Sequence, residues 1–125
     1  RLDRHPKLKI GLIESGMGWI PFAVEALEHQ FREMLPIMRN VLKKEPWDYF
    51  RDHFMGTFWF EKIAPKQLLE TIGVDNIMFE TDFPHPTSLY PGVQEHIVDV
   101  LGGYDYATKK KVLQDNAVRF YRLPF

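Results

Sequence analysis

The side chains best suited to chemistry lie in residues 80–86, which read Glu-Thr-Asp-Phe-Pro-His-Pro. Asp82 lies at the end of a predicted strand whose apolar residues are 77–79, and His85 follows in a loop that two prolines stiffen. The end of a strand is where α/β folds place catalytic groups. Asp82 can therefore bind a divalent metal ion through one oxygen, or accept a proton from metal-bound water. It can equally cap the loop by accepting backbone N–H hydrogen bonds, and the pattern leaves both roles open.

A second carboxylate, Glu14, ends another apolar run at residues 8–13. Parallel strands end at the same edge of a sheet, so we expect Glu14 and Asp82 on one rim. Two carboxylates can share acid and base work if their surroundings separate their pKa values. The competing interpretation makes Glu14 a helix cap or a partner for an arginine. Close to Glu14, Trp19 is predicted to form a wall of the substrate pocket, with core packing as the alternative.

Other short motifs exclude several reaction types. The glycine-rich residues 16–19 place backbone N–H groups at a helix start, where a carboxylate or a phosphate can bind. They lack the full dinucleotide-binding glycine spacing and the lysine of a phosphate-binding loop, which argues against a nucleotide site. No serine lies in a Gly-x-Ser-x-Gly motif, so a serine triad has no support. The remaining histidines are predicted to be structural or exposed: His5, His29, His53 and His96.

Hydrophobic patterning predicts strands within residues 8–13, 54–60 and 76–82. We expect helices over residues 20–34, 63–72, 93–101 and 105–113, a short helical turn at 46–50, and a tail that packs or frays from 116. Gly73 is expected to end one helix in a left-handed conformation, and Asp105 to cap another. Repeated strand–helix units imply parallel strands and an α/β fold. The alternatives are an open doubly wound sheet and the last three units of an eight-unit barrel, and we treat residues 1–125 as one piece.

The composition excludes several classes of protein. The 125 residues carry 16 Lys and Arg against 17 Asp and Glu, so the net charge of −1 argues against a polycationic nucleic-acid binder. With 45% hydrophobic and 14% aromatic residues the chain can build a packed core. Cysteine is absent, which excludes disulfides, thiolate metal sites and cysteine nucleophiles. Without a long apolar run or a signal-peptide pattern, we expect a soluble, cytoplasmic protein with neither nucleic acid nor membrane as a partner.

Taken in order, the motifs of this chain resemble the C-terminal part of the amidohydrolase-related family, the branch that includes aminocarboxymuconate-semialdehyde decarboxylase. The similarity extends over nearly the whole sequence, and the order and spacing of its parts make it specific. The parts are residues 5–10, 14–16, 19–21, 46–51, 78–86 and 116–117.

The resemblance implies a distorted TIM barrel, of which this chain is the C-terminal portion with about three βα units and the terminal helices. It also implies one divalent metal ion, often zinc, held by a His-x-His pair, a further histidine and an aspartate after the eighth strand. Asp82 matches that aspartate. Glu14 stands where several decarboxylases of the family carry a histidine, so hydrolysis or hydration competes with decarboxylation. We expect a small carboxylated or carbonyl substrate that His85, Glu14 and Trp19 contact.

On this interpretation the other metal ligands precede Arg1, so the chain alone is expected to bind metal weakly or not at all. The strand at residues 8–13 would lack a neighbour, which favours association with the missing N-terminal half or with further copies of the chain. The alternative function is a non-catalytic or self-associating module, inactive without that half. Substrate choice or dimer contacts are expected in residues 35–47.

Overall fold

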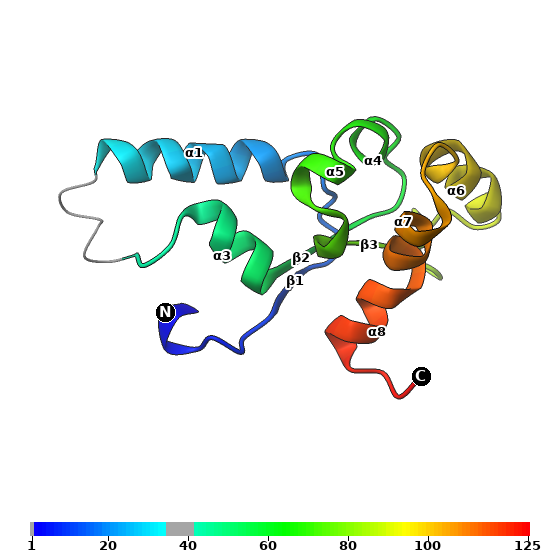
Figure 1. The fold of residues 1–125 in the computed structure, drawn as a ribbon. Helices are drawn as coiled ribbons and strands as arrows, with labels where there is room; N and C mark the ends of the chain where they lie inside the picture. The colour runs from blue at the N-terminus through cyan, green and yellow to red at the C-terminus, as the bar shows by residue number, and fades with distance from the viewer. Residues whose placement is uncertain (1, 35–41) are drawn as a thin grey trace.

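A computed structural model of the chain describes residues 2–34 and 42–125. Three strands form a parallel sheet in the order β1 (Ile10–Leu12), β2 (Phe54–Phe58) and β3 (Ile77–Phe79). Ile10 is in register with Phe54, and Gly56 with Ile77. Figure 1 shows the strands at the centre with helices on several sides. The predicted parallel α/β fold is therefore confirmed.

Helices fill most of the chain between and after the strands. They are α1 (Ile20–Glu33), α3 (Pro46–His53), α4 (Ile63–Gln67), α5 (Leu69–Ile72), α6 (Val93–Leu101), α7 (Tyr106–Lys110) and α8 (Asn116–Tyr121). Shorter helical turns are Leu2–Arg4, Val74–Asn76 and the π-helical Lys111–Asp115. The helices expected over 20–34 and 93–101 are confirmed, and α3 is longer than the short turn predicted at 46–50. The helix expected over 63–72 is divided into α4 and α5, and the one expected over 105–113 continues from α7 as a π-helix. Of the expected specificity segment, residues 35–41 lie outside the described residues. No helix in the described ranges has the length and apolar character to cross a membrane.

The strands are shorter than the apolar runs that predicted them. β1 covers three residues where residues 8–13 were expected, and Leu8 is exposed. Beyond the strands, Glu14 and Asp82 have φ angles of 52° and 60°, which turn the backbone away from the sheet direction. The excess apolar residues at the run ends therefore lie outside the strands.

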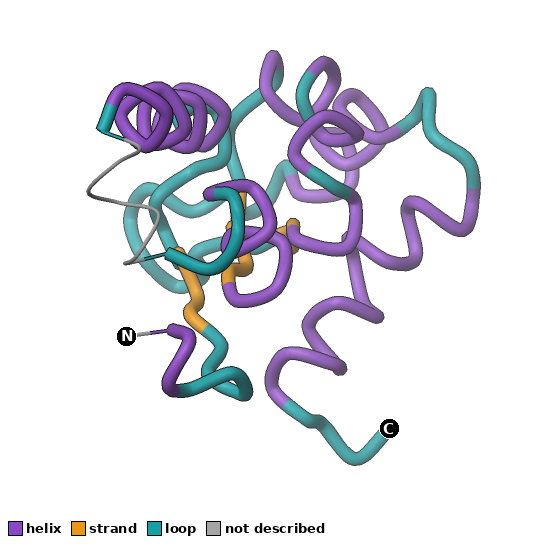
Figure 2. Tube along the Cα trace, turned by 60° about the vertical axis from the view of Figure 1, so that its left-hand side comes forward, coloured by secondary structure: helices purple, strands orange, loops and turns teal. Residues whose placement is uncertain are grey.

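The main core lies between the sheet and the helices that follow the strands. Gly56 shows how closely they pack, because a Cβ atom there would lie 2.9 Å from Ile20 and 3.1 Å from Ile77. From α1, Ile20, Val24 and Phe31 are buried at helical spacing. Figure 2 shows helical segments close to the strands, which lie near the middle of the fold. Ile63 at the start of α4 is 71% exposed, because α4 turns its other side, with Ala64, inward.

The predicted positions of the helix ends are confirmed, although Gly73, with a φ of 117° and a ψ of 117°, does not have the left-handed α conformation expected of it. The Asp105 carboxylate accepts a hydrogen bond from the Thr108 N–H at 2.7 Å, as a cap of α7. Gly73 follows α5 with a φ of 117° and donates its N–H to the Leu69 carbonyl at 3.0 Å. Of the C-terminal segment, α8 packs against the fold through Asn116, whose side chain is fully buried, whereas residues 121–125 are exposed.

Candidate active site

Asp82 lies in a tight turn just beyond β3. Its backbone carbonyl accepts the His85 N–H at 2.8 Å, and its side chain is only 9% exposed. The φ angle of Asp82 is 60°, a left-handed conformation that residues with a side chain rarely adopt. The turn therefore depends on the contacts around it. Oδ2 accepts a hydrogen bond from Thr87 Oγ1 at 3.0 Å. The loop therefore folds back to hold this carboxylate.

Three side chains form a chain of hydrogen bonds at this turn. His85 Nδ1 lies 2.8 Å from Thr87 Oγ1 and 3.2 Å from Asp82 Oδ2. A hydroxyl has one hydrogen, and because Thr87 gives it to Asp82, the bond with His85 requires His85 Nδ1 to be the donor. The neutral imidazole then carries its lone pair on Nε2, and the ring is 62% exposed. The structure thus brings Asp82 and His85 together, with an accessible proton acceptor beside the carboxylate.

The alternative prediction was that the Asp82 carboxylate caps the loop by accepting backbone N–H hydrogen bonds. Its partner in the structure is instead the hydroxyl of Thr87. In the described part of the chain, no hydrogen bond reaches Asp82 Oδ1, so this oxygen can serve as one ligand for a cation. No group of three or more His, Asp or Glu side chains within residues 2–34 and 42–125 is arranged to hold a metal ion. These residues thus fit the role of one ligand and supply no complete metal centre.

Glu80 has a role that the sequence did not reveal. Its Oε1 accepts hydrogen bonds from Thr57 Oγ1 at 2.7 Å and from the backbone N–H of Glu14 at 3.0 Å. The carboxylate therefore joins the ends of all three strands. The available signal was the period-two alternation of a strand, which places Glu80 on the same side as Asp82.

Glu14 reaches the expected rim, although it does not pair with Asp82. Its side chain is exposed, and nowhere in the described ranges does a hydrogen bond or ion pair join it to Asp82 or His85. β2 lies between the two strands concerned, and two strand spacings amount to about 10 Å. The structure thus leaves space between the two carboxylates.

The amides at the start of α1 do hold a carboxylate, as their glycine-rich sequence allowed, and it is the chain's own Glu61. Met17 N–H lies 3.1 Å from both Glu61 oxygens, and Gly18 N–H lies 3.0 Å from Oε1. A side chain at Gly16 would be strained, since its φ is 70° and a Cβ atom would lie 3.0 Å from Glu61 Oε2. The position at which the sequence suggested that a carboxylate or phosphate could bind is therefore occupied by the Glu61 side chain. The signal for Glu61 was its place directly after the predicted second strand.

Trp19 lies apart from the Asp82 loop. Its indole Nε1 donates to the Ser15 carbonyl at 3.0 Å, and the half-exposed ring lines an apolar groove of about 380 Å³. Leu12 and Phe50 also line this groove. The structure thus places Trp19 on a pocket wall, but not on the wall of a cavity that contains Asp82.

Two of the other histidines are buried within the fold. His53 Nδ1 lies 2.8 Å from the Leu8 carbonyl, which ties α3 to the segment before β1. His96 packs on Phe79, and burial followed by the nearby Lys62 charge lowers the pKa of His96 below 6.5. Both have the structural placement expected of them. His5 and His29 are exposed.

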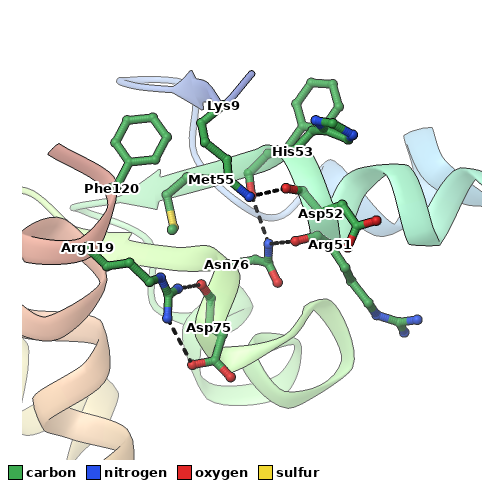
Figure 3. A pocket seen from close by; sticks show the side chains of 10 residues that line it. Lys9, Arg51, Asp52, His53, Met55, Asp75, Asn76, Arg119 and Phe120 are labelled. Carbon is green, nitrogen blue, oxygen red and sulfur yellow. Dashed lines mark hydrogen bonds and ion pairs between the residues drawn. The ribbon is translucent and has the colours of Figure 1, made fainter. Parts of the chain in front are cut away.

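A cavity of about 250 Å³ lies at the opposite, N-terminal edge of the sheet (Figure 3). Most of its polar groups form hydrogen bonds or ion pairs with one another. Asn76 donates to the Arg51 carbonyl at 2.9 Å, and Arg119 pairs with Asp75 at 3.6 Å. The Lys111 ammonium, ahead of the Arg119 charge, holds the pKa of Asp75 below its usual range. This cavity therefore has the character of a structural junction.

Comparisons with known proteins agree with this geometry. Residues 1–123 match the sequence profile of a family described as amidohydrolase. The chain is 28% identical to the 2-amino-3-carboxymuconate-6-semialdehyde decarboxylase of Dictyostelium discoideum over 127 aligned positions, covering 97% of this chain and 33% of that protein.

Solved structures show the same relationship. An amidohydrolase of Mycobacterium avium subsp. paratuberculosis has a TM-score of 0.80 at 26% identity, over 95% of this chain and 29% of that one. The 5-carboxyvanillate decarboxylase of Sphingomonas paucimobilis has a TM-score of 0.75 at 26% identity, over 97% and 36%. A dihydroxybenzoic acid decarboxylase of Polaromonas, determined with bound manganese, shares the fold with a TM-score of 0.68 at 22% identity, over 99% and 36%.

This chain thus spans about a third of the length of the relatives it matches. Its parallel sheet and surrounding helices correspond to one portion of the amidohydrolase barrel, as the order of its motifs predicted. The profile match covers nearly every residue, including the Asp82 turn, Glu14 and Asn116. The chain therefore belongs to the amidohydrolase family.

Proposed function

We propose that this chain provides the C-terminal part of a metal-dependent amidohydrolase-family enzyme that acts on a small carboxylated or carbonyl substrate. The observation that carries the proposal is the hydrogen-bonded series His85–Thr87–Asp82 at the end of β3. It leaves one carboxylate oxygen and one imidazole nitrogen available on the rim where α/β barrels place their chemistry. On this view residues 1–125 form one piece of a distorted TIM barrel.

In this proposal Asp82 Oδ1 is one ligand of a divalent cation. The cation, when bound, polarises a carbonyl group or lowers the pKa of a bound water molecule. Thr87 holds Asp82 Oδ2 and so orients the other oxygen. His85 Nε2 accepts a proton from substrate or water or binds a polar substrate group, because its other nitrogen is occupied by Thr87.

Glu14 and Trp19 are assigned to the substrate. The exposed Glu14 carboxylate serves as a base or a hydrogen-bond acceptor across the rim from Asp82. Trp19 supplies an apolar ring to the wall of the pocket. Two relatives named above, from Dictyostelium and Sphingomonas, act on carboxylated compounds as decarboxylases. Their likeness supports a carboxylated substrate here, with decarboxylation or hydrolysis as the reaction.

The cation proposed for the whole protein is zinc, with manganese as the alternative that the Polaromonas decarboxylase illustrates. A single carboxylate oxygen is acceptable to both ions. Since the described residues offer one ligand, the remaining ligands are proposed to come from an N-terminal half of the barrel. By itself the chain is expected to hold the metal weakly or not at all. A cytoplasmic location stays a prediction from the composition.

The second candidate is a non-catalytic module that self-associates. It is favoured by β1, which pairs with β2 on one side and, among the described residues, with no strand on the other. Such an edge can join another chain. Measuring the molar mass of the chain by size-exclusion chromatography with light scattering tests this candidate: a homo-oligomer supports it, and a monomer contradicts it.

The proposed function is tested by Asp82→Asn in the whole protein. The amide keeps the shape of the side chain but loses the charge that binds a cation. We expect metal content to fall from about one ion per chain and turnover to drop by at least about 100-fold. The matched control is Asp99→Asn, since Asp99 is exposed and pairs only with Lys66 and Lys62 among the described residues. Unchanged metal content and turnover in Asp82→Asn would overturn the assignment.

A further inference from the structure

We infer that Glu80 is a positioning residue, which fixes the place of Glu14 relative to Asp82 by clamping the turn after β1 onto the end of β3. The inference rests on the proposed function, in which Glu14 and Asp82 act on one substrate. It adds a residue that neither the motif pattern nor the likeness to relatives assigns.

The Glu80 carboxylate is itself held firmly. Its backbone N–H donates to the Phe58 carbonyl at 3.0 Å, which extends the pairing of β3 with β2 by one residue. Its Oε1 accepts from the hydroxyl of Thr57, a buried residue of β2, at 2.7 Å. Thr57 Oγ1 also lies 3.1 Å from the Leu12 carbonyl at the end of β1. An acceptor with these contacts has a fixed position on the rim.

The same oxygen then binds the backbone N–H of Glu14 at 3.0 Å. Glu14 has a φ of 52°, and Gly16, two residues later, has a φ of 70°. A residue with a side chain enters this left-handed region only when other contacts hold it there. The Glu80 carboxylate provides such a contact, while Ser15 Oγ donates to the Leu12 carbonyl at 3.0 Å. The direction of the Glu14 side chain therefore depends on Glu80.

Glu80 is also linked to Asp82 through the chain, since only Thr81 separates them. A substitution of Glu80 therefore changes the position of the Glu14 turn relative to the Asp82 turn. The competing explanation is that Glu80 itself binds the cation or transfers a proton. The two explanations differ in what they require: a clamp needs an acceptor oxygen, whereas a ligand or base needs the negative charge.

Two substitutions in the whole protein separate these explanations. Glu80→Ala removes the acceptor, and Glu80→Gln keeps an Oε1 acceptor of the same reach without the charge. For Glu80→Ala we expect hydrogen exchange of the Glu14 amide to accelerate by about tenfold and kcat to fall by about tenfold, with KM and metal content unchanged. For Glu80→Gln we expect both quantities to return to within about threefold of the parent. Glu70→Ala, at an exposed glutamate of α5, is the control.

Two results would overturn the inference. One is a Glu80→Gln variant as impaired in kcat as Glu80→Ala, because that requires the charge and not the acceptor. The other is a Glu80→Ala variant whose Glu14 amide exchange and kcat match those of the parent. Failure of the proposed function is recognised separately, by unchanged metal content in Asp82→Asn, because exchange of the Glu14 amide requires no turnover.

Discussion

The two ends of the sheet are held together by opposite chemistry. At the N-terminal end, neutral side-chain amides donate hydrogen bonds to backbone carbonyls. At the C-terminal end, carboxylates accept hydrogen bonds from backbone N–H groups and hydroxyls. Both ends join segments that are far apart in the sequence. At the N-terminal end the charge of Asp75 is paired with Lys111 and Arg119, whereas among the described residues no ion pair involves Glu61 or Glu80 at the C-terminal end.

The amide end is formed by two buried asparagines. Asn76 donates to the Arg51 and Phe54 carbonyls at 2.9 and 2.8 Å, the first of which can be followed in Figure 3. Asn116 donates to the Val74 and Ile77 carbonyls at 2.7 and 2.8 Å. Neutral amides satisfy buried carbonyls without the cost of burying a charge. This end is therefore built for stability.

The carboxylate end contains Glu61, Glu80 and Asp82, one from the segment after β2 and two from the segment after β3. Each is only partly buried, so its charge remains partly solvated. Glu61 and Glu80 hold backbone amides, whereas Asp82 holds a hydroxyl and keeps one oxygen for a ligand. Both ends order the chain, and the C-terminal end also retains groups that can take part in a reaction.

Among substitutions at the two ends of the sheet, Asn116→Leu at the amide end is expected to have the largest effect on stability. The change removes two donors and leaves the Val74 and Ile77 carbonyls buried near an apolar side chain. We expect the free energy of unfolding to fall by about 3 kcal/mol, measured by urea denaturation. The control is Gln114→Leu, at an exposed position of the preceding turn, where the change should stay within about 0.5 kcal/mol. Equal effects of the two substitutions would refute the stabilising role of Asn116.

A smaller loss is expected from Glu61→Ala at the carboxylate end. The Met17 and Gly18 amides lose their partner, but water can replace it because this position is only partly buried. We expect unfolding free energy to fall by about 1 to 2 kcal/mol and hydrogen exchange at Met17 and Gly18 to accelerate. Glu25→Ala, on the exposed side of α1, serves as the control. If Glu61→Ala lowered the free energy of unfolding as much as Asn116→Leu, the two ends would not differ in their contribution to stability.

The smallest expected effect is on the pH dependence of stability, and it involves His96, a buried residue of α6. Burial lowers its pKa below 6.5, Lys62 adds to the shift, and Asp99 opposes it. Below pH 6.5 the unfolded chain then binds a proton that the folded chain does not, so stability falls as the pH drops from 6.5 through the lowered folded-state pKa. In His96→Phe this part of the pH dependence should disappear. Urea midpoints between pH 7 and pH 5 check it, and identical profiles for both proteins would contradict it.

The sequence predicted the order of strands and helices because hydrophobic spacing and helix caps are local signals. The α1 pattern, the Asp105 cap and the Gly73 terminus all depend on neighbours within a few residues. The strand ends were less predictable, since Glu14 and Asp82 leave the sheet through left-handed turns. The Glu14 turn is held by the distant Glu80, and the Asp82 turn by Thr87 of the same loop. Helical spacing also gives an apolar face without saying which part of it a neighbour will cover, and Ile63 is 71% exposed.

The candidate site divides in the same way. By itself, the sequence determined that a carboxylate and an imidazole follow the third strand, and that parallel strands bring Glu14 to the same rim. Only the tertiary structure decided that Thr87 lies between His85 and Asp82, that Glu80 binds Glu14, and that Glu61 fills the amides before α1. The reason is physical: the bonds of Glu80 to Glu14 and of Glu61 to the amides before α1 join loops from different strands, 66 and 43 to 44 positions apart. Thr87 is only five residues from Asp82, but the sequence does not show how their shared loop folds back.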